Sequence, residues 1–340
     1  MNVYLRHIIK FVLSLFVILL LNTRAAGQDA QFSQFYANPL SLGPSFAGST
    51  MGSRAVLNFR DQWPSIPGSF ITYAASIDHY FARYYSGLGL QIYRDQAGSG
   101  NLALTSISLS YSYQLKINRL WHLRPGLVLS YNIRSLDFER LVFNDQMNLN
   151  GNSPVSVEAP TMENKKYSDA GFSLMAYSRV YWYGILIDHL YYPDQSLING
   201  ISHVPLKLLL YGGKKIVLAN ARRYNEENIK IAFLYKKQAE FSQLDLGTYW
   251  TKENLTFGLW YRGIPFFKQY APGYANNDAI ILMVGYKHKE LQVAYSYDIT
   301  VSRLYTNTSG AHEISLVYEF NKNRKVIKRQ KSMFIPCAKF

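Results

Sequence analysis

The feature that most constrains the fold of this chain is an alternation of apolar and polar residues with a period of two. In the clearest segment, residues 106–115, isoleucine, leucine and tyrosine occupy every second position, and serine or glutamine occupies the positions between them. A period of two indicates a β-strand with two different faces. A strand that crosses a bilayer needs roughly 9–11 residues with this alternation and carries aromatic residues at its rims.

The same alternation recurs in fourteen segments of the chain. They are 55–61, 70–79, 86–94, 106–115, 122–132, 168–178, 181–188, 204–211, 228–235, 241–250, 255–262, 278–287, 291–300 and 310–320. A soluble sandwich would also contain such strands, but an even number of them suits a closed barrel whose first and last strands end on the same side of the membrane. We therefore predict an all-β fold, a transmembrane outer-membrane barrel of about 14 antiparallel strands over residues 54–320.

The expected connections between these segments differ in length on the two sides of the barrel. One side has 80–85, 116–121, 179–180, 251–254 and 288–290, with a longer exception at 212–227, and the other has 133–167, 189–203, 263–277 and 301–309. Short periplasmic turns and longer outer loops are typical of outer-membrane barrels. A soluble sandwich has no physical reason to separate its loops by length.

The N-terminal residues 1–27 have the composition of a secretory signal peptide. Arg6 and Lys10 precede an apolar run of eleven residues, which is too short to span a bilayer comfortably, and small residues follow before Gln28. No cysteine stands directly after this segment, which argues against a lipid anchor. We therefore expect export, a mature chain that begins near Gln28, and insertion in the outer membrane.

Two further segments flank the predicted barrel. Residues 28–53 are polar and aromatic with several prolines and glycines, which predicts an ordered periplasmic arm rather than a strand. Residues 321–340 contain seven lysines and arginines and no acidic residue, which predicts a basic periplasmic tail. Of the formal net charge of +14, only about +4 belongs to the chain between the signal peptide and this tail. The charge therefore describes a tail and not a nucleic-acid-binding surface.

Polar residues that face the predicted lumen offer few candidates for catalysis. By the alternation, Asp298 and Glu313 lie on adjacent strands and could face each other, and paired carboxylates can perform acid–base chemistry. Solvation of the lumen, or ion pairs with Arg94, Arg124 and Arg262, which we also expect to face inward, accounts for these carboxylates without catalysis. The sequence contains no His-x-x-x-His, G-x-S-x-G or Walker motif. We predict no catalytic residue, metal or cofactor, and an outer-membrane hydrolase or acyltransferase is the least favoured function.

Longer motifs in the arm and the first hairpin resemble those of a known family. Gln28–Gly48 reads QDAQFSQFYANPLSLGPSFAG, and Asn58–Asp78 reads NFRDQWPSIPGSFITYAASID. These stretches resemble the F-S-Q-Y-Y-x-N-P-L, P-A-F-A-G and R-x-Q-W-P-x-x-P-G elements of the PorP/SprF family, carried here by Phe32–Leu40, Pro44–Gly48 and Arg60–Gly68. The ending Pro336–Phe340 is similar to a C-P-R-F ending in the family, although Pro precedes the cysteine, Ala replaces Pro and Lys replaces Arg.

The resemblance extends over essentially the whole mature chain and carries functional implications that composition does not. Family members are non-enzymatic barrels of the type IX secretion and gliding-motility apparatus of the Bacteroidota. The resemblance implies that the protein holds a secreted cargo with a type-B C-terminal sorting domain, such as a gliding adhesin, at the cell surface. It also implies a link to the periplasmic ring and motor, with outer-membrane lipids around the barrel.

A general diffusion porin is the alternative function. Fourteen strands and a serine-lined wall are compatible with an open channel. We see no globular plug domain before the first strand, which argues against a plugged iron transporter.

Residues in the first outer link form one candidate partner-binding site. Trp63, Pro64, Pro67 and Gly68 lie between the first two strands, where the prolines stiffen the backbone at low entropic cost. Trp63 would be an exposed aromatic anchor of the kind that interfaces favour. The other interpretation is that Trp63 packs into the mouth of its own barrel.

The basic tail is the second candidate site. Lys325, Lys328 and Arg329 could dock on an acidic periplasmic partner or on lipid phosphates, or they could belong to a solvated end. Cys337 is the only cysteine, which excludes an internal disulfide and leaves either a spare thiol or a functional one.

Overall fold

The structure is a computed structural model of the chain. It describes residues 29–143, 146–148, 151–152, 164–198, 200–219, 227–271, 274–302, 308–321 and 335–336. The expected signal peptide lies outside the described residues, as do the cations of the tail and Cys337.

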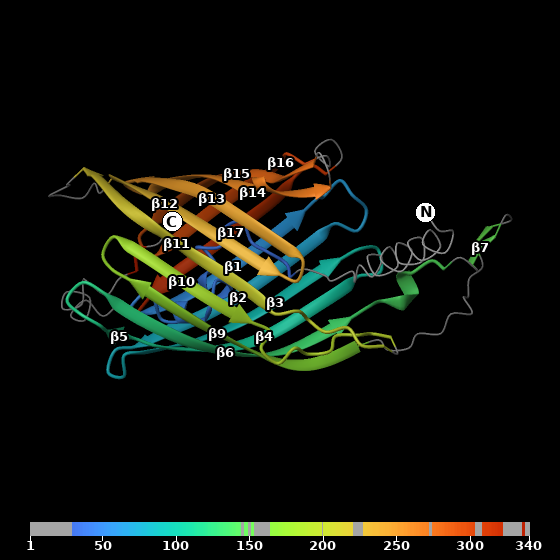
Figure 1. Cartoon of the computed structure of the whole chain (residues 1–340), viewed down its shortest axis with the longest axis horizontal. Coiled ribbons are helices and arrows are strands. Elements are labelled where there is room, and N and C mark those ends of the chain that lie inside the picture. The colour runs from blue at the N-terminus through green and yellow to red at the C-terminus, as the bar shows by residue number, and fades with distance from the viewer. Residues whose placement is uncertain are drawn as a thin grey trace, which may run out of the picture.

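In the described part of the chain, fourteen antiparallel strands form a closed barrel (Figure 1). The strands are β1 (Ser53–Gln62), β2 (Phe70–Phe81), β3 (Ser86–Ala97), β4 (Leu102–Tyr113), β6 (His122–Ser135), β9 (Asn164–Tyr177), β10 (Tyr181–Asp188), β11 (Lys207–Ala219), β12 (Glu227–Gln238), β13 (Phe241–Lys252), β14 (Leu255–Ala271), β15 (Tyr274–His288), β16 (Leu291–Thr300) and β17 (Ala311–Phe320). Consecutive strands pair around the ring, and the pairing of β1 with β17 closes it. The predicted barrel of fourteen strands is confirmed.

Smaller elements accompany the barrel. The short strand β5 (Leu115–Lys116) pairs with the start of β6, and β7 (Met147–Asn148) with β8 (Gly151–Asn152) forms a hairpin beyond one end of the barrel (Figure 1). The 3-10 helices η1 (Pro39–Ser41), η2 (Pro44–Phe46) and η3 (Phe138–Arg140) each contain three residues. Among the described residues, no helix is long and apolar enough to cross a membrane.

The predicted faces of the strands are also confirmed. On β4, Leu109 is 54% exposed on the outer surface, whereas Ser110 and Ser112 are buried inside. Neighbouring strands keep this register, since Leu109 lies opposite Leu90 and Leu129, and Ser110 opposite Gly89 and Val128. Because side chains alternate between the two faces, this register places Leu109 outside together with its neighbours Leu90 and Leu129.

Arg94 is an exception to our expectations. We expected it to face the lumen, but it shares the parity of Leu88, Leu90 and Ile92, which are exposed on the outer face of β3. Its guanidinium is exposed and donates a hydrogen bond to the Thr105 hydroxyl, 3.2 Å away. The two-residue period itself places this side chain outside, so the inward prediction was wrong.

The two ends of the barrel carry different connections. We call the end where β1 begins and β17 ends the turn end, and the opposite end the link end. The turn end has 82–85, 114–121, 178–180, 220–226, 253–254 and 289–290, and the link end has 63–69, 98–101, 136–163, 189–206, 239–240, 272–273 and 301–310. The longest connections therefore gather at the link end, as predicted.

Two predicted connections are largely strand in the structure. Pairing of β14 with β15 continues through much of 263–277, with register shifts after Arg262 and Ile264 that accommodate the glycine and proline of this stretch. At the turn end, β11 continues to Ala219 and pairs with β12, which reduces the predicted link 212–227 to residues 220–226. Backbone pairing to a long neighbour outweighs the local turn signal in both cases.

The N-terminal arm lies inside the barrel. Its residues Phe32–Leu40 are all buried, and its side chains and backbone contact strands on all sides of the ring, including β3, β6, β10 and β17. Asp29 contacts the link-end residues of β11 and β12, and Ser53 begins β1 at the turn end. The arm therefore crosses the lumen from the link end to the turn end. The predicted periplasmic location of this arm is wrong for the described residues, because its polar and aromatic side chains find their partners on the inner wall.

Candidate functional site

The arm and the inner wall that holds it form the main candidate site, which begins at the link end. Asp29 accepts hydrogen bonds from Lys207 Nζ at 2.8 Å and from Gln238 Nε2 at 3.0 Å, and its carboxylate lies 2.9 Å from His189 Nε2. Burial would raise the pKa of Asp29, but Lys207 and His189 outweigh it and hold that pKa well below its usual range. We call Asp29, His189, Lys207 and Gln238 the link-end anchor.

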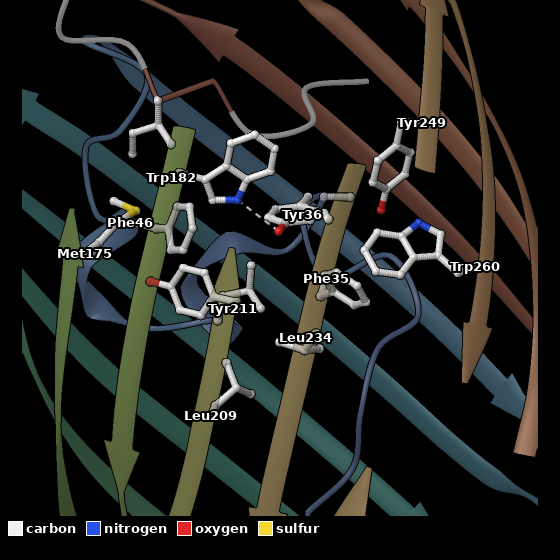
Figure 2. Close-up of a cluster of buried hydrophobic side chains, with 14 of the residues drawn as sticks. Phe35, Tyr36, Phe46, Met175, Trp182, Leu209, Tyr211, Leu234, Tyr249 and Trp260 are labelled. Atoms are coloured by element: carbon white, nitrogen blue, oxygen red, sulfur yellow. Dashed lines mark hydrogen bonds between the residues drawn. The ribbon is translucent and has the colours of Figure 1, made fainter. Parts of the chain in front are cut away.

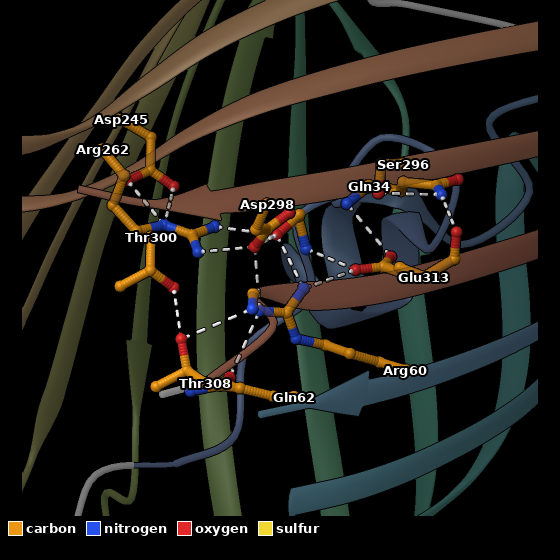
Figure 3. Close-up of polar contacts among 12 residues, drawn as sticks. Gln34, Arg60, Gln62, Asp245, Arg262, Ser296, Asp298, Thr300, Thr308 and Glu313 are labelled. Carbon is orange, nitrogen blue, oxygen red and sulfur yellow. Dashed lines mark hydrogen bonds and ion pairs between the residues drawn. The ribbon is translucent and has the colours of Figure 1, made fainter. Parts of the chain in front are cut away.

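A buried network of charged side chains holds the next residues of the arm (Figure 3). Arg60 Nη2 lies 2.9 Å from Asp298 Oδ2, and Arg60 Nη1 lies 3.2 Å from Glu313 Oε2. Arg262 Nη1 approaches the same Asp298 oxygen at 3.1 Å and also pairs with Asp245. All five side chains are almost completely buried.

The arm completes this network from inside. The Ser33 hydroxyl donates to Asp298 at 2.5 Å and accepts from Arg60 and Arg262 at 2.8 and 3.0 Å. The backbone N–H groups of Ser33 and Gln34 donate to Glu313 at 2.6 and 3.0 Å. Buried charges are stable only when pairing and hydrogen bonds replace their lost hydration. The arm and the charged network therefore stabilise each other.

An aromatic cluster encloses the middle of the arm (Figure 2). The Trp182 indole N–H donates to the Tyr36 hydroxyl at 3.1 Å, and the rings of Phe35 and Trp260 meet edge to face with centroids 4.8 Å apart. Phe46 packs on Tyr211 with centroids 5.5 Å apart. Burial of such rings dominates the energetics of protein cores. This half of the barrel thus has an apolar interior, which the serine alternation of residues 106–115 did not predict.

Close backbone contacts hold the arm near the turn end. The Gly48 N–H donates to Asp78 at 2.7 Å, and Arg54 pairs with the same carboxylate at 2.8 Å. A Cβ atom added to Gly87 would overlap the Ala47 carbonyl, and one added to Gly126 would overlap the backbone of Pro44 and Ser45. Glycine within a strand often marks such a close approach of another backbone.

The paired carboxylates that we considered for catalysis are parts of the buried network. Asp298 and Glu313 do lie close together, but both pair with Arg60, and Asp298 also pairs with Arg262. The inward location predicted for Arg124 and Arg262 is confirmed. Among the described residues, no group of three or more histidine, cysteine or acidic side chains has the arrangement of a metal site.

The four candidate residues of the first outer link lie together at the link end. Trp63 is half-buried, and its ring packs edge to face on Phe70 with centroids 5.6 Å apart. The backbone N–H of Trp63 donates to the Gly310 carbonyl at 2.8 Å. Pro64 and Pro67 are exposed, and the carbonyl of Gly68 accepts a hydrogen bond from Gly98 at 3.0 Å. The Phe70 ring on which Trp63 packs is itself 40% exposed, and both interpretations of Trp63 stay predictions.

The candidate residues of the tail, Lys325, Lys328, Arg329 and Cys337, lie outside the described residues. Two tail residues are described, and both are buried. Ile335 belongs to the same cluster of buried apolar side chains as Phe46 and Trp182, and Pro336 follows it. The tail thus meets the barrel interior at this point.

Comparison with protein-family models identifies the family of the chain. Residues 24–318 match the model of a family described as type IX secretion system membrane protein PorP/SprF. The chain belongs to the PorP/SprF family. This membership makes the protein a membrane component of type IX secretion. No curated protein matches the chain.

Solved structures of barrels resemble this PorP/SprF protein distantly. The P. putida toluene transporter TodX has a TM-score of 0.45 and 9% identity, covering 82% of this chain and 93% of its own. A Pseudomonas aeruginosa FadL homologue has a TM-score of 0.42 and 13% identity, covering 82% and 94%. A porin mutant of Rh. blastica has a TM-score of 0.34 and 9% identity, covering 79% and 99%.

Several residues of the site were missed in the sequence because their role depends on partners far along the chain. Arg60 and Ser33 belong to PorP/SprF family motifs. These motifs do not show that the two side chains, 27 residues apart in the sequence, form a hydrogen bond. His189 and Lys207 carried no signal, since His189 lies in a connection and Lys207 directly follows it. An isolated acidic residue at the start of the arm is the one local hint.

Proposed function

We propose that this PorP/SprF protein is a non-enzymatic outer-membrane anchor for a secreted cargo that bears a type-B C-terminal sorting domain. In this proposal the link end faces the cell exterior and receives the cargo, and the turn end faces the periplasm and contacts the ring and motor of the secretion system. Long connections at the link end support this orientation, because outer loops of such barrels are generally longer than periplasmic turns.

The observation that carries the proposal is the filling of the lumen by the arm. A diffusion porin needs a continuous aqueous path, whereas here Phe35, Tyr36 and Phe46 pack on the inner wall and Ser33 joins a buried ion network. Such a molecule offers its two rims, rather than its interior, to large partners. The filled lumen therefore favours the anchor over the porin.

Conductance in planar bilayers tests this choice. We expect purified wild-type protein to conduct ions poorly, and a variant that lacks residues 29–50 to conduct well if it inserts, because the deletion removes the arm from the lumen. Steady porin-like conductance of the wild-type protein would support the alternative function.

Surface display tests the role of the link end. The triple variant Trp63→Ala, Pro64→Ala and Pro67→Ala should reduce display of a fluorescent reporter fused to a type-B sorting domain, because it removes the accessible ring and the stiff backbone next to it. Tyr84→Ala is the matched control, since Tyr84 is an exposed aromatic residue of the turn end. Equal loss of display in both variants would contradict a cargo site at Trp63, Pro64, Pro67 and Gly68.

A truncation ending at Asn321 tests the role of the basic tail, including Lys325, Lys328, Arg329 and Cys337. We expect the truncated barrel to insert and to keep its heat-modifiable mobility in gels, because the strands end at Phe320. It should no longer co-purify with periplasmic ring components, and the wild-type interaction should weaken with salt. Unchanged co-purification would assign the periplasmic contact to another part of the turn end.

A further inference from the structure

A cavity of about 190 Å³ lies between the arm and the inner wall of the barrel. Apolar side chains form one part of its lining, with Phe32 and Leu42 from the arm and Leu209 and Leu234 from β11 and β12. All four are buried. A cavity of roughly 150 Å³ with an apolar lining is already large enough to hold a benzene molecule.

The opposite wall of the cavity is polar. Ser106 and Ser108 of β4 and Ser130 of β6 face the cavity. Among the described residues, neither Ser106 nor Ser108 makes a side-chain hydrogen bond, so their hydroxyl groups are available to a ligand. Ligand sites typically combine such an apolar lining with a few polar groups that fix orientation.

A buried lysine marks one end of the cavity. Lys236 of β12 lines it, is only 7% exposed, and donates to the backbone carbonyl of Asp29 at 3.1 Å. Among the described residues, no carboxylate lies within 4.0 Å of its ammonium group. The neighbouring charges have carboxylate partners, since Lys207 pairs with Asp29 and Asp188, and His189 pairs with Asp29 and Asp169.

The absence of a carboxylate beside the Lys236 ammonium group, within the described part of the chain, indicates which ligand the cavity would accept. Asp29 and Asp245 also line the cavity, but neither carboxylate contacts Lys236. A buried ammonium group with no carboxylate in contact is costly, and an anion that enters the cavity would relieve that cost. The anion must be small enough for a cavity of about 190 Å³. It must also have an apolar chain that can pack against Leu209 and Leu234. We propose that the lumen binds a small amphipathic carboxylate, with its head group at Lys236 and its apolar chain between the arm and β10–β12.

Access to the cavity is from the link end. Asp188, Lys207 and Gln243 line it and lie at or near the link ends of β10, β11 and β13, and Gln195 and Val204 of the connection 189–206 line it as well. A ligand would therefore enter beside this connection without displacing the aromatic cluster around Tyr36. This site goes beyond the proposed anchoring of cargo and does not depend on it.

Ligand-observed saturation-transfer NMR on the purified full-length protein tests the proposal. The probes are octanoate, 1-octanol and octylammonium, which share one chain and differ in head-group charge. We expect octanoate to bind more tightly than 1-octanol, and octylammonium not to bind inside the barrel. Equal binding of octanoate and octylammonium would overturn the proposal, because the site would then not discriminate charge.

Two matched variants locate the site. Lys236→Met removes the ammonium group at nearly constant volume and should weaken octanoate binding by at least about tenfold while it leaves 1-octanol binding unchanged. Lys237→Met is the control, since Lys237 is the next residue and is exposed on the outer face of β12. If octanoate binds Lys236→Met as well as it binds the Lys237→Met control, the proposal is wrong.

A cavity-filling variant provides a second, independent measurement. Ser108→Phe should remove binding of both octanoate and 1-octanol, because its ring would occupy the space beside the apolar wall. Heat-modifiable gel mobility confirms that each variant is folded. If folded Ser108→Phe protein still binds octanoate at the wild-type level, the binding lies elsewhere and the proposal fails.

Discussion

At the scale of single residues, Arg60 is the side chain on which the polar contacts of the arm converge. It lies within hydrogen-bond distance of Ser33, Asp298 and Glu313, and all of these groups are buried. In such a network each charge compensates the desolvation of the others, so the loss of one member leaves the rest uncompensated. The stability of the filled lumen should therefore be unusually sensitive to this position.

Arg60→Ala should lower the free energy of unfolding by about 3–5 kcal/mol, because it leaves Glu313 buried without its cation. Arg94→Ala is the control, since that guanidinium is exposed on the outer face, and its effect should stay within about 0.5 kcal/mol. Urea denaturation in detergent, followed by gel mobility, measures both. Similar losses in the two variants would contradict the buried network.

His189 makes the link-end anchor dependent on pH. Burial would lower its pKa, but Asp29 and Asp169 outweigh this and raise the pKa to about 10, above the ordinary value of 6.5. A group whose folded-state pKa is raised stabilises the fold fully below its unfolded pKa, and this contribution is lost as the pH rises through the folded pKa. The anchor should therefore be strongest below about pH 6.5 and weaken towards pH 10.

The measurement is the urea midpoint between pH 6 and pH 10.5 for wild type and His189→Gln. The wild-type midpoint should fall more steeply with rising pH than that of the variant, because Gln carries no proton to lose. Titrating groups away from His189 contribute equally to both curves. Parallel curves would show that His189 is not held in its charged form.

At the scale of elements, the arm fits the barrel because particular strands leave room for its backbone. Gly87 on β3 and Gly126 on β6 lie directly against Ala47 and against Pro44–Ser45. Two 3-10 turns fold the arm compactly here, one at Pro39–Ser41 just before these contacts and one at Pro44–Phe46. The arm is thus an internal element of the barrel, with its own partners on the inner wall.

Gly126→Ala should displace the arm without disturbing the lipid-facing surface, because the added methyl group would overlap backbone atoms that cannot move aside cheaply. We expect faster proteolysis within residues 29–52 while the barrel keeps its heat-modifiable mobility. Gly200→Ala is the control, since a Cβ at Gly200 meets no atom closer than 3.9 Å. Equal protease resistance of the two variants would mean that the arm tolerates the loss of this contact.

At the scale of the whole molecule, an apolar outer surface surrounds an interior with two different halves. Polar and charged residues dominate the interior of β1–β6, whereas β9–β15 carry most of the buried aromatic and aliphatic residues beside the charged pair Asp245 and Arg262. The outer surface must match lipid, and the interior must match the arm. These two requirements can be separated experimentally on one strand.

Leu109→Arg should impair assembly more than Ser108→Arg. Leu109 is 54% exposed on the outer face, where an arginine in the middle of the bilayer costs about 2–4 kcal/mol. Ser108 faces the cavity, which leaves room for part of a longer polar side chain. Ser110 also faces inward, but it is only 2% exposed and leaves less room for an arginine, so Ser108 is the better control. Heat-modifiable mobility after expression measures assembly, and equal yields would contradict the assigned faces of β4.

Local alternation in the sequence was enough to predict the strands, their number and their two faces. Alternation is a local property, since neighbouring side chains of a strand point to opposite sides whatever the rest of the chain does. For the same reason the outward position of Arg94 was available from Leu88, Leu90 and Ile92. The family motifs added the secretion system, which no physical property of the residues could supply.

The location of the arm and the contacts that hold it could not be predicted from local patterns, because they depend on the closed barrel. Ser33 meets Glu313 and Asp298, and Asp29 meets Lys207 and Gln238, across separations of 178 to 280 residues. Such contacts form only when ring closure brings distant strands around one lumen, so no local pattern encodes them. An arm of polar and aromatic residues could as well have projected into water. It lies inside because the closed barrel provides buried charges and rings that its side chains complete.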